Sequence, residues 1–224
     1  DPCPDDKDFL IQFGNGLTPV PSNWNATTDL CDFVGITCDT ATNSFPVTLN
    51  FEDSSYSGSL SEDLSCLAEL REIRLNGNTF SGTLPPEWCT LTKLRIMQLH
   101  DNQLDGSLPP EWSELVSTEV MFLQNNDLDG ALPGEWSELT AVTDLRMQGN
   151  SFTGTLPAFW STFSNLETMR LEENSLNGTL PSEWSEFAAA QTMHLFANGL
   201  SGTLPTEWSE LSNLAVMLLD DNSF

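Results

Sequence analysis

Few residues in this chain could do chemistry: five cysteines, two histidines and a large excess of carboxylates. His100 stands beside Asp101, but neighbours along a strand point to opposite faces, so we do not expect a catalytic pair. The sequence has no Gly-rich phosphate loop, no nucleophile elbow and no His or Cys spacing typical of a metal site. The repeated glutamates lack the burial that an acid–base pair needs. We therefore predict no enzyme, no cofactor and no metal site, with weak calcium binding between neighbouring glutamates as a minor alternative.

The cysteines all lie within the first 89 residues. Cys31 and Cys38 are seven residues apart, and Cys66 and Cys89 fall in successive repeats. Such pairs predict a disulfide-stapled cap formed in an oxidising compartment, and buried free thiols in a cytosolic protein are the alternative. Cys3 is left to pair elsewhere, to link to another chain or to stay free.

Two sequons for N-glycosylation, at Asn25 and Asn177, agree with secretion. The N-terminus has no signal-peptide pattern, so we expect that any such peptide has been removed.

A period of 24 residues runs through most of the chain without insertion or deletion. It is carried by Gly58, Gly82, Gly106, Gly130, Gly154, Gly178 and Gly202, by Asn78, Asn102, Asn126, Asn150, Asn174, Asn198 and Asn222, and by Trp88, Trp112, Trp136, Trp160, Trp184 and Trp208. A fixed period of this size indicates one structural unit stacked on itself, which is a solenoid.

Within one repeat, the apolar pattern around Leu94, Met97 and Leu99, followed by Asn102, is that of a leucine-rich repeat. Alternation predicts a short half-buried strand, and about eight such strands should stack in a parallel concave sheet. We interpret the asparagines as partners of buried backbone groups and the tryptophans as core of the convex side. The predicted fold is an α/β-type solenoid, a leucine-rich-repeat horseshoe with an irregular or 3-10 convex side. Residues 1–45 form its N-terminal cap and residues 46–224 its repeats, whose last one we expect to be uncapped.

The formal charge of −26 argues against nucleic acid or anionic lipid as a partner, because both need a basic surface. No apolar run is long enough to cross a bilayer. Two columns of glutamates on the convex side, such as Glu111 and Glu114, are interpreted as a solvated face that favours solubility.

The segment Asp29–Cys38 resembles the cysteine-bracketed cap of plant-type leucine-rich repeats, with Phe33 in place of the usual Trp. The repeat Gly82–Trp88 is similar to those of promastigote surface antigens and proteophosphoglycans of kinetoplastid parasites. That resemblance implies an extracellular protein, secreted or GPI-anchored, that acts in adhesion; any anchor signal would lie outside this chain. The regular Asn column is more plant-like than those antigens.

Binding is expected on the concave face, the usual binding surface of a horseshoe. All five arginines fall at strand positions, and arginine and aromatic residues supply most hot-spot energy. The alternative is that Arg146 and Arg170 only pair with Asp144, Glu172 and Glu173. The predicted partner-binding residues are Arg74, Gln98, His100, Phe122, Arg146, Arg170, His194 and Phe196.

We therefore predict an extracellular recognition or adhesion protein, a cell-surface antigen that binds a protein or glycan. A structural subunit of an extracellular coat, assembled through self-association, is the alternative.

Overall fold

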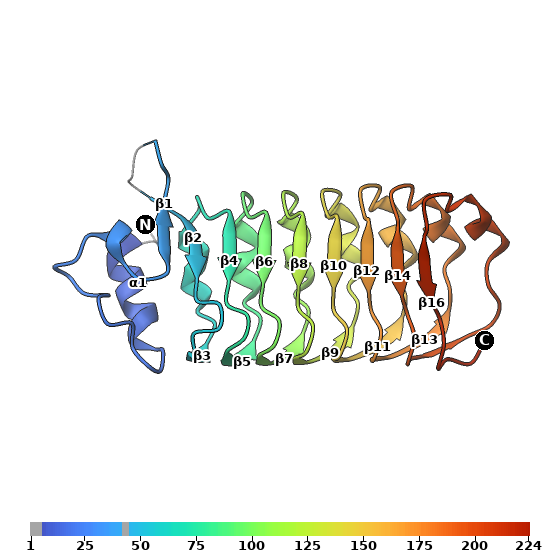
Figure 1. The fold of residues 1–224 in the computed structure, drawn as a ribbon, viewed down its shortest axis with the longest axis horizontal. Coiled ribbons are helices and arrows are strands. Elements are labelled where there is room, and N and C mark those ends of the chain that lie inside the picture. Colours follow the sequence, from blue (N-terminus) through green and yellow to red (C-terminus); the bar gives the residue numbers. More distant parts are fainter. Residues whose placement is uncertain (1–5, 42–44) are drawn as a thin grey trace.

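The computed structural model describes residues 6–41 and 45–224 as a two-sheet solenoid. Figure 1 looks onto the larger sheet, whose strands stand side by side in sequence order from the N-terminal cap towards the C-terminus. The predicted leucine-rich-repeat horseshoe with its parallel sheet is confirmed.

The larger sheet has nine strands in the order β1-β2-β4-β6-β8-β10-β12-β14-β16. Its first strand, β1 (Ile36–Cys38), belongs to the cap and pairs antiparallel with β2 (Pro46–Asn50). The parallel strands that follow are β4 (Glu72–Arg74), β6 (Ile96–Gln98), β8 (Val120–Phe122), β10 (Asp144–Arg146), β12 (Thr168–Arg170), β14 (Thr192–His194) and β16 (Val216–Leu218). In each pairing between β4 and β16 the partners are 24 residues apart, so equivalent side chains form rows across the sheet.

A second parallel sheet, which the sequence did not reveal, runs along the lower edge of Figure 1. It consists of β3 (Ser57–Ser59), β5 (Thr79–Thr83), β7 (Gln103–Ser107), β9 (Asp127–Ala131), β11 (Ser151–Thr155), β13 (Ser175–Thr179) and β15 (Gly199–Ser201). The glycine in each strand of this sheet from β5 to β13 has a left-handed backbone, which other residues rarely adopt. At Gly178, with φ of 80°, an added Cβ would also lie only 2.8 Å from Thr155 Cγ2.

The rest of the solenoid is built from one α-helix and a series of short 3-10 helices. Helix α1 (Asp6–Asn15) covers the N-terminal end. The 3-10 helices are Leu30–Asp32, Glu62–Cys66, Pro86–Thr90, Pro110–Glu114, Gly134–Glu138, Ala158–Thr162, Ser182–Glu186 and Thr206–Glu210. From Pro86 onward each begins directly after a proline, as expected for a residue that fixes the entry to the turn.

The asparagine column satisfies the backbone of the buried turns, as predicted. Asn126 Nδ2 donates to the carbonyl oxygens of Leu99 (3.1 Å) and Leu123 (3.0 Å), and its Oδ1 accepts the N–H of Leu104 (3.0 Å). The same side chain therefore joins three segments of two neighbouring coils. The pattern recurs at Asn78, Asn102, Asn150, Asn174, Asn198 and Asn222.

The tryptophans form a buried column, which confirms their interpretation as core. Trp112 and Trp136 are fully buried, and their rings stack with centroids 6.2 Å apart. Each indole N–H also donates to a carbonyl of the preceding coil, as Trp136 does to Pro109 at 2.9 Å. One side chain thus supplies packing and a hydrogen bond between coils.

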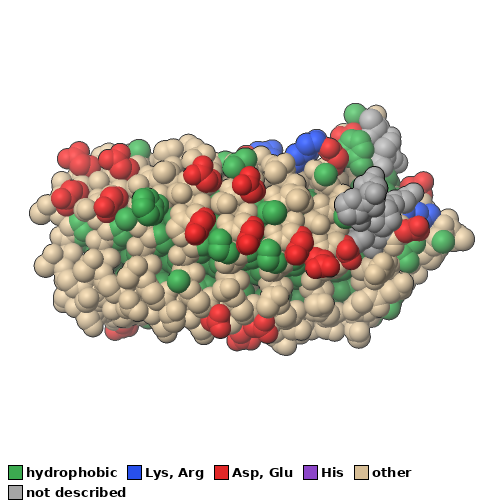
Figure 2. All heavy atoms as spheres, turned by 180° about the vertical axis from the view of Figure 1, so that it is seen from behind, with side chains coloured by type: hydrophobic (Ala, Val, Ile, Leu, Met, Phe, Trp, Pro, Cys, Tyr) green, Lys and Arg blue, Asp and Glu red, His purple; other side chains and the backbone are tan. Residues whose placement is uncertain are grey.

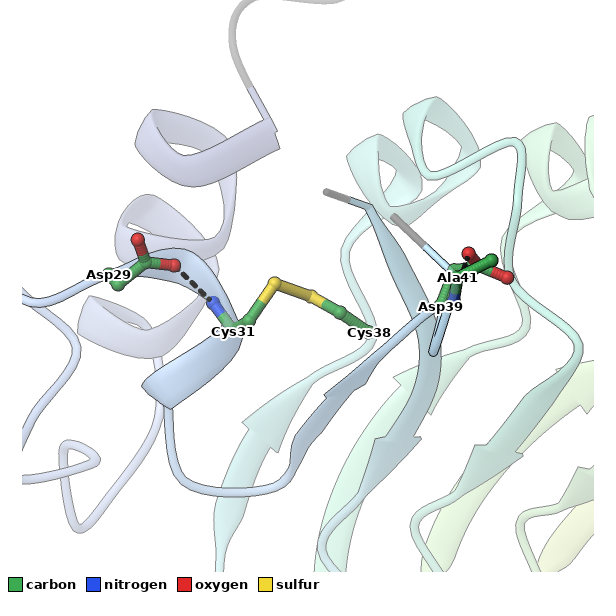
Figure 3. The surroundings of a disulfide bond; sticks show 5 residues. All are labelled: Asp29, Cys31, Cys38, Asp39 and Ala41. Carbon is green, nitrogen blue, oxygen red and sulfur yellow. Dashed lines mark hydrogen bonds between the residues drawn. A yellow bond between two sulfur atoms is a disulfide. The ribbon is translucent and has the colours of Figure 1, made fainter. Parts of the chain in front are cut away.

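The cap has its own aromatic core and one described disulfide. Trp24 stacks on Phe33 with centroids 5.3 Å apart and also contacts Phe51 at 5.4 Å. Figure 3 shows the predicted Cys31–Cys38 disulfide, which ties the 3-10 turn after Asp29 to β1.

The expectation of a disulfide at Cys89 was wrong, because Cys89 is a free thiol. Cys66 is disulfide-bonded, with a partner outside the described residues, where Cys3 also lies. The repeat equivalent of Cys66 is Thr90, so Cys89 is one residue out of register on its 3-10 turn and points in another direction.

Replacing Asn126 by Ala tests the asparagine column. The change leaves the buried Leu104 N–H without its partner, which costs about 1–3 kcal/mol, and removes one of the two side-chain donors to each of the Leu99 and Leu123 carbonyls, each bond being worth about 0.5–1.5 kcal/mol. We expect the free energy of unfolding in urea to fall by about 3 kcal/mol or more. The exposed Gln103→Ala is the control and should change it by less than about 0.5 kcal/mol. A loss below about 1 kcal/mol at Asn126 would contradict the role assigned to the column.

Candidate functional site

The outer side of the nine-stranded sheet, here called the strand face, is the predicted concave face. Its central row consists of Arg74, Gln98, Phe122, Arg146, Arg170 and His194, which are direct partners on consecutive strands from β4 to β14. The predicted alignment of these residues is confirmed. His100 and Phe196 lie two residues beyond the ends of β6 and β14, beside this row.

The arginines of the central row are paired with carboxylates of the same strand face. Arg146 Nε donates to Asp144 Oδ1 at 2.9 Å and its Nη2 to Asp144 Oδ2 at 2.7 Å. This hydrogen-bonded contact raises the pKa of Arg146. Arg170 Nε donates to Glu172 Oε1 at 2.8 Å. These carboxylates therefore partly neutralise the positive charge of Arg146 and Arg170. The alternative interpretation of the sequence, in which the arginines pair with neighbouring acidic residues, is confirmed for Asp144 and Glu172.

Arg74 is held in a similar way near the N-terminal end of the row. Its Nε donates to Glu72 Oε2 at 3.1 Å and its Nη1 to Gln98 Oε1 at 3.0 Å. Outside the central row, Arg95 forms hydrogen bonds with both carboxylate oxygens of Glu119.

Two aromatic clusters flank the paired arginines. The Arg146 guanidinium lies over the Phe122 ring, 4.5 Å from its centroid, and the edge of His100 faces the same ring at 5.7 Å. Further along, the rings of His194 and Phe196 are 6.2 Å apart. Arg146 is thus fixed between a carboxylate and an aromatic ring, an arrangement that presents a preorganised surface to a partner.

His100 and Asp101 lie closer together than expected. The distance from His100 Nε2 to Asp101 Oδ2 is 3.9 Å. The strand alternation that would separate them has ended, because Asp101 has left-handed backbone with φ of 55°. The contact is long and Asp101 is exposed, so this pair gives no catalytic geometry.

The buried position of Glu172 is the feature of this face that the sequence did not predict. Its side chain is only 2% exposed although it stands on the solvent side of the sheet. Glu172 belongs to a column whose members are 24 residues apart. The residue types in that column do not indicate which members are covered by neighbouring side chains.

Acidic side chains recur along the opposite, convex side, as Figure 2 shows. They include Glu87, Glu111, Glu135, Glu183 and Glu207 in the first turns of the 3-10 helices. Over residues 6–41 and 45–224, no cluster of three or more His, Cys, Asp or Glu side chains is placed to hold a metal.

Both predicted glycosylation sites are exposed in the structure. Asn25 lies in the cap, and Asn177 lies on β13 in the second sheet. No helix in the described part of the chain is both long and apolar enough to cross a bilayer.

Comparison with known proteins agrees with this architecture. Residues 3–39 match the leucine rich repeat N-terminal domain family, and residues 69–91, 93–115 and 165–187 match the Leucine Rich Repeat family. The protein is a leucine-rich-repeat solenoid. No catalytic family is indicated by these matches.

Plant proteins are among those similar to this chain. The receptor-like kinase TMK4 of Arabidopsis thaliana is 30% identical over 74 residues, which are 33% of this chain and 8% of that protein. The structure of PEPR1–AtPEP1 has a TM-score of 0.93 and 29% identity over 97% of this chain and 31% of that one. The plant peptide hormone receptor RGFR1 in complex with RGF2 has a TM-score of 0.72 and 29% identity over 74% of this chain and 27% of that one.

A plant ice-binding protein shares the fold, with a TM-score of 0.83 and 23% identity over 98% of this chain and 72% of that one. The solenoid spans about a third or less of the length of TMK4, PEPR1 and RGFR1.

These findings correct the proposed kinetoplastid resemblance, which was wrong. The cap and the repeats are similar to plant receptor ectodomains and not to promastigote surface antigens. The short Leu-Pro-x-Glu-Trp version of the repeat does not identify a family, since a repeat motif reflects packing needs that many proteins share. The expectations of a surface antigen, an adhesin and a GPI anchor rested on that resemblance and lose their support, and nothing in the matches points to a coat subunit.

His100 should make stability depend on pH. Burial lowers its pKa, although Asp101 and Glu52 act in the opposite direction. The unfolded chain therefore binds the proton more readily, and stability rises as pH rises through about 6.5, the ordinary value for histidine. We expect His100→Gln to reduce the loss in unfolding free energy that wild type shows between about pH 7.5 and 5.5. Equal losses in both proteins, measured by urea unfolding, would contradict this assignment.

Proposed function

We propose that this protein is an extracellular recognition module that binds a peptide or protein partner on its strand face. The observation that carries the proposal is the continuous central row, in which aromatic rings and paired arginines are held in fixed positions across six strands. Aromatic and arginine side chains supply most of the energy at protein interfaces. Support also comes from the similar plant peptide hormone receptor RGFR1, whose solved structure is a complex with RGF2.

The long face suits an extended ligand better than a compact small molecule. Six strands at about 4.8 Å give a row about 24 Å long, which a peptide of about seven extended residues would span. The disulfide between Cys31 and Cys38 agrees with an oxidising, extracellular setting.

A random seven-residue peptide library provides the test. Peptides selected on wild type should lose about 30-fold or more in affinity for the Phe122→Ala, Arg146→Ala, Arg170→Ala triple variant, because hot-spot residues each contribute about 2 kcal/mol or more. A variant with Ser137→Ala and Glu138→Ala on the convex side is the matched control and should bind like wild type. Selected peptides that bind all three proteins equally would place the site elsewhere.

Ice is a second candidate ligand, favoured by one specific observation on the second sheet. The outward residues of β11, β13 and β15 carry no charge in a protein of net charge −26. They are Ser151, Thr153, Thr155, Ser175, Asn177, Thr179, Gly199 and Ser201. A rigid sheet presents such hydroxyl groups at a regular spacing of about 4.8 Å, which suits a periodic solid. The protein of similar fold that is described as ice-binding agrees with this candidate.

Thermal hysteresis and ice recrystallisation measure this activity directly. The protein should be made without N-glycosylation, because a glycan on Asn177 would cover the face formed by β11, β13 and β15. In this form it should inhibit ice growth. Thr155→Tyr with Thr179→Tyr should abolish inhibition by breaking the regular surface, whereas the exposed convex Ser209→Tyr should not. Absence of inhibition by the wild-type protein would remove the candidate.

A further inference from the structure

One column of the strand face carries buried polar atoms that have no hydrogen-bond partner among the described residues. The column, here called the open row, contains one residue per repeat, two positions beyond each strand. Its members and atoms are Asn76 Oδ1, His100 Nδ1, Gln124 Oε1, Gln148 Oε1 and Glu172 Oε2. Five successive repeats thus share the same unusual feature.

Folded proteins rarely leave such atoms unpaired, because each costs stability. The asparagine column two residues later shows that this chain can satisfy buried polar groups fully: Asn126 uses both its donor and its acceptor, whereas Gln124 leaves its Oε1 unpaired. The open row also lies beside the aromatic clusters of the strand face. These acceptors are covered by neighbouring side chains, so their positions point to hydrogen-bond donors from outside the chain that reach them when the covering side chains rotate aside.

Glu172 defines the chemistry of that donor. Its Oε1 accepts from Arg170, and the Nδ1 of His194 lies 3.6 Å from the same oxygen, whereas Oε2 has no partner. A carboxylate oxygen is an acceptor, and a desolvated carboxylate binds a charged donor more strongly than a neutral one.

The next repeat places Phe196 after Glu172 in the same column, with its ring 6.2 Å from that of His194. An aromatic ring beside a carboxylate favours a cation, because both the ring face and the carboxylate attract positive charge.

We propose that the peptide ligand of the strand face carries a lysine or arginine side chain that binds Glu172 Oε2 beside Phe196, with further donors of the peptide on Gln148 and Gln124. This assignment rests on the proposed function. The three acceptors span two strand spacings, about 10 Å, which is the length of about three extended residues. The net charge of −26 would also draw a basic peptide towards the protein.

The random seven-residue library tests the assignment with a matched pair of variants. Glu172→Gln and the exposed neighbour Glu173→Gln remove the same charge, so general electrostatic attraction changes equally in both. Peptides selected on wild type should contain Lys or Arg. Their affinity should fall at least tenfold for Glu172→Gln and less than twofold for Glu173→Gln, with melting temperatures recorded for both. A new selection on Glu172→Gln should lose the preference for basic residues.

Gln124→Met separates a ligand contact from a structural one. If the open row faces a ligand, the apolar isostere should leave the melting temperature unchanged or higher and weaken the selected peptides. A lowered melting temperature would show that Gln124 serves the fold.

The outcomes distinguish this assignment from the proposed function. Selected peptides could lose affinity for the triple variant of Phe122, Arg146 and Arg170 but bind Glu172→Gln and Glu173→Gln with equal affinity. That result would overturn the basic-residue assignment and leave the strand face as the binding surface. Selected peptides without basic residues would also overturn it. Peptides insensitive to the triple variant would overturn the proposed function itself.

Discussion

Every coil of this protein turns through buried corners, where backbone amides and carbonyls are shielded from water. The asparagine column resolves that constraint, since Asn126 and its equivalents bond to the coil before and to their own coil at once. A polar group at this place that lacked either bond would be more costly than an apolar one. The corner therefore requires an amide at the same step in every repeat, and stacking in register follows from it.

The same register aligns equivalent side chains on every surface of the solenoid. Because the coils superpose, Arg146 lies directly beside Arg170 in the sheet, and Trp112 lies over Trp136 in the core. A single substitution per repeat can then tune a surface without altering the fold. The strand face holds paired charges and aromatic rings, the strands β11, β13 and β15 of the second sheet hold hydroxyl groups, and the convex side holds carboxylates.

Much of the architecture could be predicted because the period is strict. The strands of the larger sheet from β2 to β16, the asparagine column and the buried tryptophans follow from spacing and residue type. The second sheet could not be predicted in this way, since a segment such as Thr79–Thr83 offers one buried apolar residue and a glycine, too short a pattern to indicate a strand. Cys89 was misassigned because sequence spacing does not show which side of a 3-10 turn a side chain occupies.

The sequence by itself determined that equivalent residues align in rows, because a constant period leaves the chain one way to stack. Only the tertiary structure decided how the members of a row differ. Glu172 is buried and half paired whereas the adjacent Glu173 is exposed, and His100 meets Asp101 because the backbone leaves the strand there. Burial and hydrogen bonding depend on what neighbouring coils place around a side chain, and that information is spread over residues far apart in the sequence.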